Sequence, residues 1–180
     1  GRLDGRSELS LRLGPDAAID WDTAQASIES RQGLLASGDP AGAYERAAGA
    51  EAIFSGGLLP GLEARWIEEQ RAILEELRLT ALETIARSGA GLGAGERARA
   101  ERAARSAVEA APFRESARVA QIEVMRAQGN IAEALRSYEE LRVLLRDELG
   151  TFPSRELNGL HEQLLNAHES SGEVKPASQR

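Results

Sequence analysis

The side chains in this sequence that are best suited to chemistry are two histidines, a run of glycines and several pairs of glutamates. His161 and His168 stand seven residues apart, and neither has a carboxylate or a second histidine at the i, i+4 spacing of the helical zinc motif. We therefore expect both histidines on an exposed helix face, and we expect no metal and no other cofactor.

The glycines between residues 89 and 95 do not fit a phosphate-binding loop. Such a loop follows a strand and ends in Lys with Ser or Thr after it, whereas Gly89, Gly91 and Gly93 follow a helical pattern and lead to no such pair. We interpret them as part of a loop between two helices.

The glutamate pairs could in principle serve as a general acid and a general base. A catalytic pair needs burial to raise one pKa, but most of these glutamates stand three or four residues from arginines, as on solvated helix faces. The pairs are Glu68 with Glu69 and Glu75 with Glu76, and the arginines are Arg65, Arg71 and Arg78. The sequence therefore predicts a protein that is not an enzyme.

The composition narrows the class of protein. The 180 residues carry a formal net charge of −7 and contain no cysteine and few aromatic residues, and the richness in Ala, Leu, Glu and Arg favours helices. The negative charge argues against binding to a nucleic-acid backbone.

No apolar stretch is long enough to cross a membrane, and the first residues do not resemble a signal peptide. We therefore expect a cytoplasmic protein without membrane contact. The chain begins at Gly1 rather than Met, as a processed product or a fragment of a longer protein would.

The apolar pattern divides the chain into three segments. Residues 1–19 contain a strand-like alternation from Glu8 to Leu13, and this strand either pairs within the segment or is the last strand of a domain located upstream. Residues 20–169 form a helical domain, and residues 170–180 form a polar, disordered tail. With Gly and Pro as breakpoints, helices are predicted over residues 22–36, 40–54, 62–88, 96–110, 114–128, 131–149 and 154–169.

A spacing of 34 residues relates the glycines that precede two of these helices. Gly95 is followed by Ala100 and Gly129 by Ala134, each at plus five, and Gly38 begins a weaker third copy. The glycine permits a tight turn between antiparallel helices, and the small residue lets the helices approach closely. Because this is the length of a tetratricopeptide unit, we predict an all-α, irregular tetratricopeptide-like array of about seven helices, with a left-handed conformation at Gly129. The alternative is that Ala-rich helices with glycine turns match this spacing by chance.

The stretch from Leu149 to Ser154 joins the last two helices through a rigid corner. We expect Gly150 to end the first helix in the left-handed conformation, Phe152 to be buried between the two helices, and Pro153 to lie in the first turn of the second. The second helix carries an apolar stripe that we expect to cover the end of the array. The stripe consists of Leu157, Leu160, Leu164 and Leu165. Trp66 and Met125 are interpreted as core residues.

With these elements placed, residues 14–168 resemble the bacterial transcriptional activation domain of SARP-type regulators, the antibiotic regulatory proteins of actinobacteria. The resemblance depends on Gly14 to Asp20, Trp66 to Arg78, Gly129 to Tyr138 and Leu145 to Ser154. It implies an all-helical, tetratricopeptide-like domain that follows a winged-helix DNA-binding domain. Two departures concern loops, because Phe152 replaces a small aliphatic residue and the loop from Gly89 to Gly95 is longer and richer in glycine.

The resemblance further implies transcription activation through protein contacts, namely self-association on DNA and contact with RNA polymerase. DNA binding would reside in the upstream domain and not in this chain. Two alternatives stay open: a generic tetratricopeptide adaptor, and a ligand-sensing domain that controls an attached effector domain. By analogy with tetratricopeptide arrays, in which the first helix of each pair lines a concave groove, we expect Gln32, Glu123 and Arg126 to bind a protein partner. The alternative for these three side chains is that they solvate a convex surface.

Overall fold

The computed structural model describes residues 2–4, 10–12, 20–30 and 38–172 of the chain. At the N-terminus, β1 (Arg2–Asp4) pairs antiparallel with β2 (Ser10–Arg12), and Leu3 lies opposite Leu11. The predicted strand therefore pairs within the first segment, which was one of the two alternatives.

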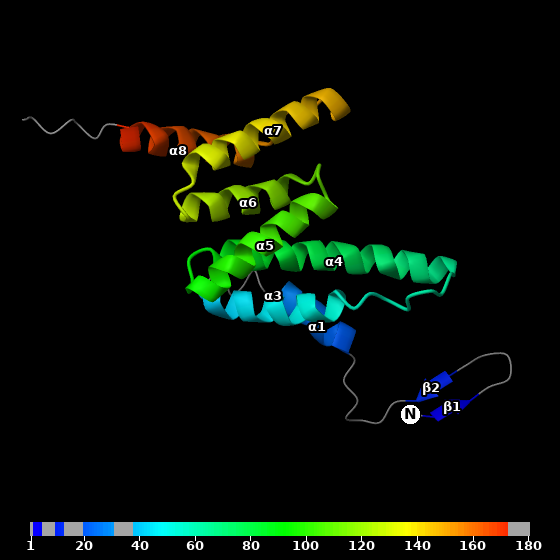
Figure 1. Cartoon of the computed structure of the whole chain (residues 1–180). Coiled ribbons are helices and arrows are strands. Elements are labelled where there is room, and N and C mark those ends of the chain that lie inside the picture. Colours follow the sequence, from blue (N-terminus) through cyan, green and yellow to red (C-terminus); the bar gives the residue numbers. More distant parts are fainter. Residues whose placement is uncertain (1, 5–9, 13–19, 31–37, 173–180) are drawn as a thin grey trace, which may run out of the picture.

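Seven α-helices follow in the described residues, and the prediction of an all-α fold is confirmed (Figure 1). They are α1 (Asp20–Glu29), α3 (Pro40–Phe54), α4 (Arg65–Gly89), α5 (Ala94–Ala110), α6 (Glu115–Ala127), α7 (Ile131–Leu149) and α8 (Arg155–Gly172). Their ends agree with the predicted ranges to within three residues, except that residues 31–36 of the first predicted helix lie outside the described residues.

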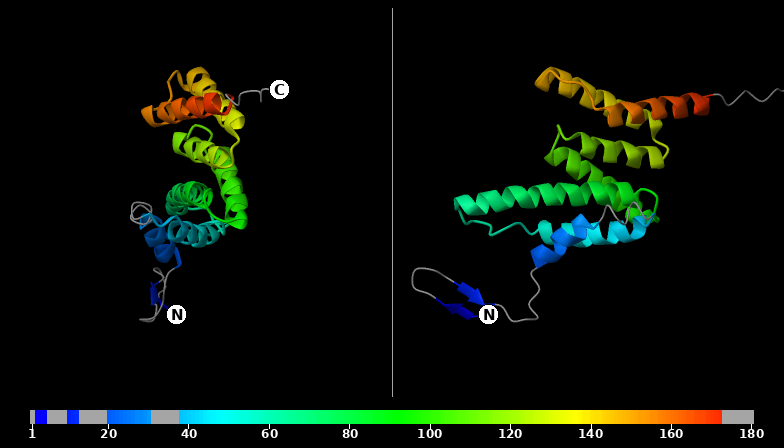
Figure 2. Two further views of the ribbon diagram at one scale, coloured as in Figure 1. Left: turned by 90° about the vertical axis from the view of Figure 1, so that its left-hand side faces the viewer. Right: turned by 180° about the vertical axis from the view of Figure 1, so that it is seen from behind.

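The helices form two layers, as the tetratricopeptide spacing predicts (Figure 2). In the first layer, α4 packs against α1 and α6, and α6 packs against α8. Each helix of the second layer contacts two successive helices of the first: α3 contacts α1 and α4, α5 contacts α4 and α6, and α7 contacts α6 and α8. The chain is therefore a series of helix pairs that ends with a single additional helix, α8.

Small residues lie where the helices cross. Ala43, Ala100 and Ala134, which occupy the same position in the three copies of the repeat, are completely buried. At the end of α4, a Cβ atom added to Gly89 would lie 3.0 Å from Tyr44 Cε2 and 3.1 Å from Ala100 Cβ. Larger side chains at these crossings would therefore push the helices apart.

The turns also follow the glycine pattern. Gly129 has a φ angle of +79° and Gly150 a φ angle of +62°, so both left-handed predictions are confirmed. At the end of α7, the N–H of Gly150 donates to the carbonyl of Arg146 and the N–H of Thr151 donates to the carbonyl of Leu145, both at 3.1 Å. These two hydrogen bonds satisfy carbonyls in the last turn of α7. At the end of α6, the N–H of Gly129 donates to the carbonyl of Arg126 at 3.0 Å and the N–H of Asn130 donates to that of Met125 at 2.9 Å, which is the hydrogen-bond pair of the Schellman motif.

Two apolar clusters make up most of the core. The larger joins α1, α3, α4 and α5 around Ile28, Phe54 and Ile85, and the smaller joins α6, α7 and α8 around Leu141, Leu157 and Leu164. A third cluster, dominated by alanines of α4, α5 and α6, lies among these three helices. Met125 is half-buried against the smaller cluster, which agrees with its assignment to the core.

The sequence-based predictions at the corner before α8 are partly wrong. Phe152 is 78% exposed and not buried between α7 and α8, because leucines of these two helices already fill the space between them. Pro153 lies two residues before α8, and Ser154 lies between them. Within the predicted stripe, Leu157, Leu160 and Leu164 are buried, but Leu165 is 41% exposed.

The assignment of Trp66 to the core is also wrong, since its side chain is 57% exposed. In this part of α4, Ile67 and Leu74 are the buried apolar residues. Arg71 holds the preceding loop against the helix by donating to the carbonyls of Leu58, Leu59 and Leu62 at 2.7–3.1 Å.

Candidate protein-binding groove

Two of the three predicted partner-binding residues lie together on the first layer of helices, and the third cannot be placed. Glu123 and Arg126 are on α6, one of the three helices of the smaller apolar cluster. Gln32 lies outside the described residues. The two residues therefore define a candidate groove between α4 and α6, with Gln163 of α8 at its border.

Glu123 and Arg126 connect α6 to both of its neighbours in the first layer. Arg87 Nε of α4 lies 2.9 Å from Glu123 Oε2, and the two side chains are 44% and 26% exposed. On the other side, Arg126 Nη1 donates to Gln163 Oε1 of α8 at 3.0 Å. A polar row therefore crosses three helices that are separated in the sequence.

A hollow of about 460 Å³ opens beside this row. It is lined by Arg87, Ala90, Gly91, Glu123, Arg126 and Ala127. The small residues come from the ends of α4 and α6, and the charged side chains stand among them. This arrangement can accept a side chain or a short segment of a partner and offer it charged groups of both signs. It contains no nucleophile.

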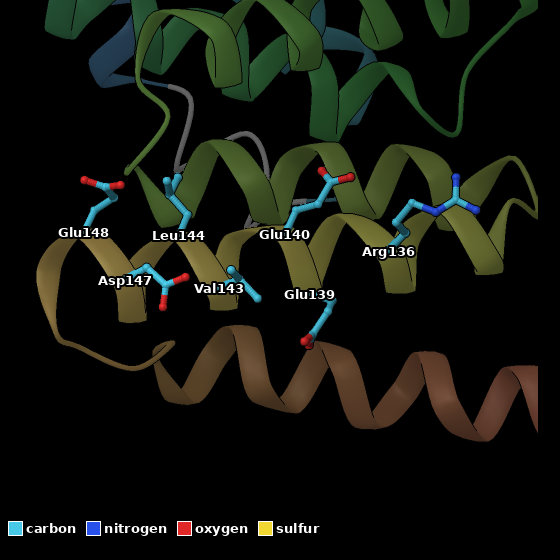
Figure 3. A pocket seen from close by; sticks show the side chains of 7 residues that line it. All are labelled: Arg136, Glu139, Glu140, Val143, Leu144, Asp147 and Glu148. Atoms are coloured by element: carbon cyan, nitrogen blue, oxygen red, sulfur yellow. The ribbon is translucent and has the colours of Figure 1, made fainter.

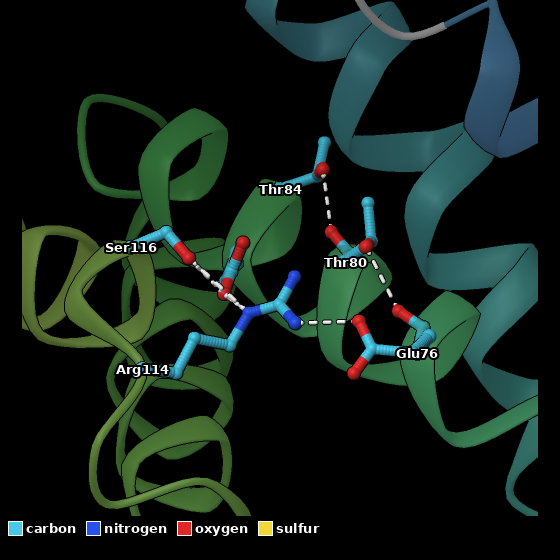
Figure 4. Close-up of polar contacts among 6 residues, drawn as sticks. Glu76, Thr80, Thr84, Arg114 and Ser116 are labelled. Carbon is cyan, nitrogen blue, oxygen red and sulfur yellow. Dashed lines mark hydrogen bonds and ion pairs between the residues drawn. The ribbon is translucent and has the colours of Figure 1, made fainter. Parts of the chain in front are cut away.

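At the other end of α6, a polar cluster fixes that helix against α4 (Figure 4). Arg114, just before α6, donates from Nε to Glu83 Oε1 and from Nη1 to Glu76 Oε2, both at 2.6 Å, and Ser116 Oγ donates to Glu83 Oε1 at 2.8 Å. Burial disfavours the charged guanidinium, but the hydrogen bonds to Glu76 and Glu83 outweigh it and raise the pKa of Arg114 above its usual value. The cluster positions the groove and is not part of it.

A second hollow, of about 490 Å³, lies on α7 in the other layer (Figure 3). It is lined by Arg136, Glu139, Glu140, Val143, Leu144, Asp147 and Glu148. Although this hollow is slightly larger, all of its lining residues come from one helix, and Glu139 and Asp147 are paired with Arg142 and Arg146 at 2.6 Å. The hollow beside α6 brings together groups of two helices, and we consider it the better candidate.

The two histidines differ from each other. His168 is exposed, as predicted, but His161 is half-buried and stacks on Tyr138, with ring centroids 4.0 Å apart and an interplanar angle of 5°. Tyr138 also donates its hydroxyl to Asn158 Oδ1 at 2.7 Å. His161 therefore fixes α8 to α7, and the prediction of an exposed face is wrong for this residue.

Within the described residues, no three His, Cys, Asp or Glu side chains stand close enough together to hold a metal ion. None of the described helices has a stretch apolar and long enough to pass through a membrane.

The sequence interpretation missed Arg87 and Gln163, the partners of Glu123 and Arg126. A signal for them existed, because each partner stands about one 34-residue repeat away from the residue it contacts. Side chains that face the same groove from successive repeats are expected at that offset. The same offset applies to Arg114, which stands 31 residues from Glu83 and 38 from Glu76.

The comparisons with known proteins agree with this architecture. A family model described as "Bacterial transcriptional activator domain" matches residues 19–165. The regulatory protein AfsR of Streptomyces coelicolor is 31% identical over 163 residues, and that of Streptomyces griseus is 32% identical over 164 residues. Each alignment covers 91% of this chain and 16% of the relative, so the chain spans a small part of the length of these relatives. The match to the family model, the AfsR relatives and the two-layered helical array together establish that the chain belongs to the bacterial transcriptional activator domain family of SARP-type regulators.

Proposed function

We propose that this chain is the protein-interaction domain of a SARP-type transcriptional activator, and that it supports self-association and contact with RNA polymerase. DNA binding resides in an upstream domain, the chain is not an enzyme, and it acts in the cytoplasm. The polar row across α4, α6 and α8 supports this proposal best, because protein recognition needs groups from several elements that converge on one surface.

The two charged residues of α6 give the groove its specificity. Glu123 presents a carboxylate and Arg126 a guanidinium to the same hollow, so a partner that offers an acidic and a basic side chain at matching positions is favoured over others. Each is fixed by a neighbour of the first layer, which lowers the conformational entropy lost on binding.

The test inverts the charges of the groove without breaking its ion pair. In one variant, Arg87→Glu is combined with Glu123→Arg, and Arg126→Glu is added in a second. We expect both variants to fold, and we expect their binding to purified actinobacterial RNA polymerase holoenzyme, measured by biolayer interferometry, to weaken at least about tenfold.

The matched control swaps an ion pair of the other layer, with Glu139→Arg and Arg142→Glu on α7. This variant should bind RNA polymerase as the unchanged chain does. Equal binding by the groove variants and the unchanged chain would reject the groove as the contact surface.

A ligand-sensing domain is the second candidate, and one observation favours it. The hollow beside α6 has a volume within the range of small-molecule sites, roughly 300–1,000 Å³. A thermal-shift screen of small metabolites would reveal such a ligand, and its stabilising effect should disappear in the Arg126→Glu variant. If no metabolite raises the melting temperature, the proposal of a protein-interaction domain stands alone.

A further inference from the structure

Exposed apolar side chains gather along one edge of the array. At this edge each second-layer helix connects to the next first-layer helix, through the loop between α3 and α4, the turn between α5 and α6, and the turn between α7 and α8; Figure 1 shows the three connections on the same side of the array. We call these exposed residues the apolar edge: Ile53, Leu59, Leu62, Trp66, Ile73, Phe113, Leu149 and Phe152. In the described part of the chain, one other large apolar side chain is similarly exposed, Leu165 of α8.

Aromatic residues are concentrated in this edge. The chain has 3 Phe, 2 Trp and 2 Tyr, and three of these seven residues, Trp66, Phe113 and Phe152, are between 46% and 78% exposed at the edge. Phe54, Tyr44 and Tyr138 are buried in the core. Since exposed aromatic rings are costly in water and are enriched in interface hot spots, this concentration indicates a binding surface.

Short polar contacts connect the parts of the edge. Trp66 and Ile73 are seven residues apart and therefore lie on the same side of α4. One turn later on α4, Glu76 Oε2 lies 2.6 Å from Nη1 of Arg114, the residue after Phe113. Glu115 Oε2 in turn accepts a hydrogen bond from the N–H of Ser154 at 2.8 Å, two residues after Phe152. The apolar edge therefore runs from α4 past the start of α6 to the start of α8.

The lengths of two helices explain why the first part of the edge is uncovered. Helix α4 has 25 residues and α6 has 13, a difference of about 18 Å at 1.5 Å per residue. The ion pairs that join α4 to α6 and to Arg114 just before it involve Glu76, Glu83 and Arg87 of α4. The first turns of α4, with Trp66 and Ile73, therefore project beyond α6.

The free charges along the edge are mostly negative. Glu68, Glu69, Glu76 and Asp147 are paired with arginines. Among the described residues, exposed carboxylates at the edge without an ion pair or hydrogen bond are those of Glu63, Glu109, Glu148 and Glu156. One nearby guanidinium, that of Arg155, is also unpaired within the described residues. The surface that a partner meets is thus apolar and aromatic with an excess of negative charge.

We propose that the apolar edge binds a basic amphipathic segment of a partner protein. The apolar side chains of the segment pack on Trp66, Phe113 and Phe152, and its Lys and Arg side chains face the unpaired carboxylates. This inference depends on the proposed protein-interaction function, and it adds a second contact on a surface other than the groove of Glu123 and Arg126.

The test uses the whole 180-residue chain and two synthetic amphipathic peptides of about 18 residues, long enough to form a helix. One peptide contains Leu and Lys and the other Leu and Glu in the same pattern. We expect the Leu/Lys peptide to bind, by isothermal titration calorimetry, and to shift the fluorescence of Trp66 to shorter wavelength in a Trp21→Phe background. The Leu/Glu peptide should bind at least about tenfold more weakly.

Variants locate the binding surface. Trp66→Ala combined with Phe152→Ala should weaken binding of the Leu/Lys peptide at least about tenfold, and the melting temperature should not change, because both side chains are exposed. Leu165→Ala is the matched control, since it removes an exposed apolar side chain outside the edge. Equal losses in the two variants, or equal binding of the two peptides, would overturn the proposal.

Two further measurements separate this inference from other outcomes. The groove variant with Arg87→Glu and Glu123→Arg should bind the Leu/Lys peptide with unchanged affinity. Loss of peptide binding in that variant would overturn the assignment to the edge, whether or not the variant also loses binding to RNA polymerase. If sedimentation equilibrium finds self-association that Trp66→Ala and Phe152→Ala abolish, the edge binds a second copy of the chain and the proposal of a basic partner is wrong.

Discussion

Gly129 and Gly49 form a natural pair for testing the repeat turn at the scale of single residues. A Cβ atom added at either position would meet nothing within 4 Å, but Gly129 has a φ angle of +79° and Gly49 lies inside α3. We expect Gly129→Ala to destabilise the fold by roughly 1 kcal/mol, because an L residue resists the left-handed conformation. Gly49→Ala should stabilise it by a similar amount, about 0.5–1 kcal/mol, through helix propensity.

Thermal unfolding followed by circular dichroism measures both variants. For a chain of this size, a change of 1 kcal/mol shifts the melting temperature by about 2–4 °C. Shifts of the melting temperature with the same sign in Gly129→Ala and Gly49→Ala would show that backbone conformation does not determine the change in stability at the turn.

Arg114 offers a second test at this scale, because its two carboxylate partners differ in burial. The side chain of Glu83 is 13% exposed and that of Glu76 is 67% exposed. Arg114→Ala leaves Glu83 as a largely buried carboxylate without its ionic partner, and we expect a loss of about 1–3 kcal/mol in the free energy of unfolding, measured by urea denaturation.

Variants of the two glutamates show which ion pair of Arg114 stabilises the fold. Glu76→Gln should change stability by less than about 1 kcal/mol, as exposed ion pairs do. In the Arg114→Ala background, Glu83→Gln should recover part of the loss, because the amide no longer carries an unpaired charge. If Glu76→Gln lowers the free energy of unfolding as much as Arg114→Ala does, the ion pair with the exposed Glu76 is the stabilising contact.

At the scale of the element, α8 acts as the cap of the array. Its buried residues Leu157, Leu160 and Leu164 pack on α7, and Tyr138 contacts it through a hydrogen bond and a ring stack. Its start is fixed to α6 by the hydrogen bond from Ser154 to Glu115. This is the way in which helical repeats cover their last apolar face.

We expect a chain that ends at Gly150 to aggregate or to lose most of its stability. Leu141 and Leu145 of α7 would become exposed, and the burial of each leucine contributes roughly 1.5–3 kcal/mol. Thermal denaturation and light scattering measure both effects.

The matched control ends at Glu169, after the last buried leucine of α8, Leu164. It should melt as the unchanged chain does. If the chain that ends at Gly150 stays monomeric with an unchanged melting curve, α8 is not a cap.

At the scale of the whole molecule, the net charge of −7 opposes binding to DNA. We expect the isolated chain not to bind duplex DNA with sequence preference, because affinity for the phosphate backbone comes from Lys and Arg that release counterions. A gel-shift assay at low and physiological salt measures this. Sequence-selective binding that persists at physiological salt would show that the chain itself reads DNA.

The success of the sequence interpretation depended on how local each signal was. The left-handed glycines at 129 and 150 and the buried alanines at 100 and 134 were predicted, because a turn and a helix crossing impose their requirements on single positions. Trp66 and Phe152 were assigned to the core in error, since both were judged by residue type alone. Glu123 and Arg126 were selected by analogy, but their partners Arg87 and Gln163 were not.

The sequence by itself determined the helices, their turns and their pairing order. A 3.6-residue apolar period, the need for glycine at positive φ and a 34-residue spacing act within one or two elements and can be read along the chain. Only the tertiary structure decided which apolar side chains stay in water and which charged groups meet. Trp66 is exposed because α4 is longer than α6 and projects beyond it. Burial and ion pairing depend on the relative placement of helices far apart in the sequence, and local patterns do not encode that placement.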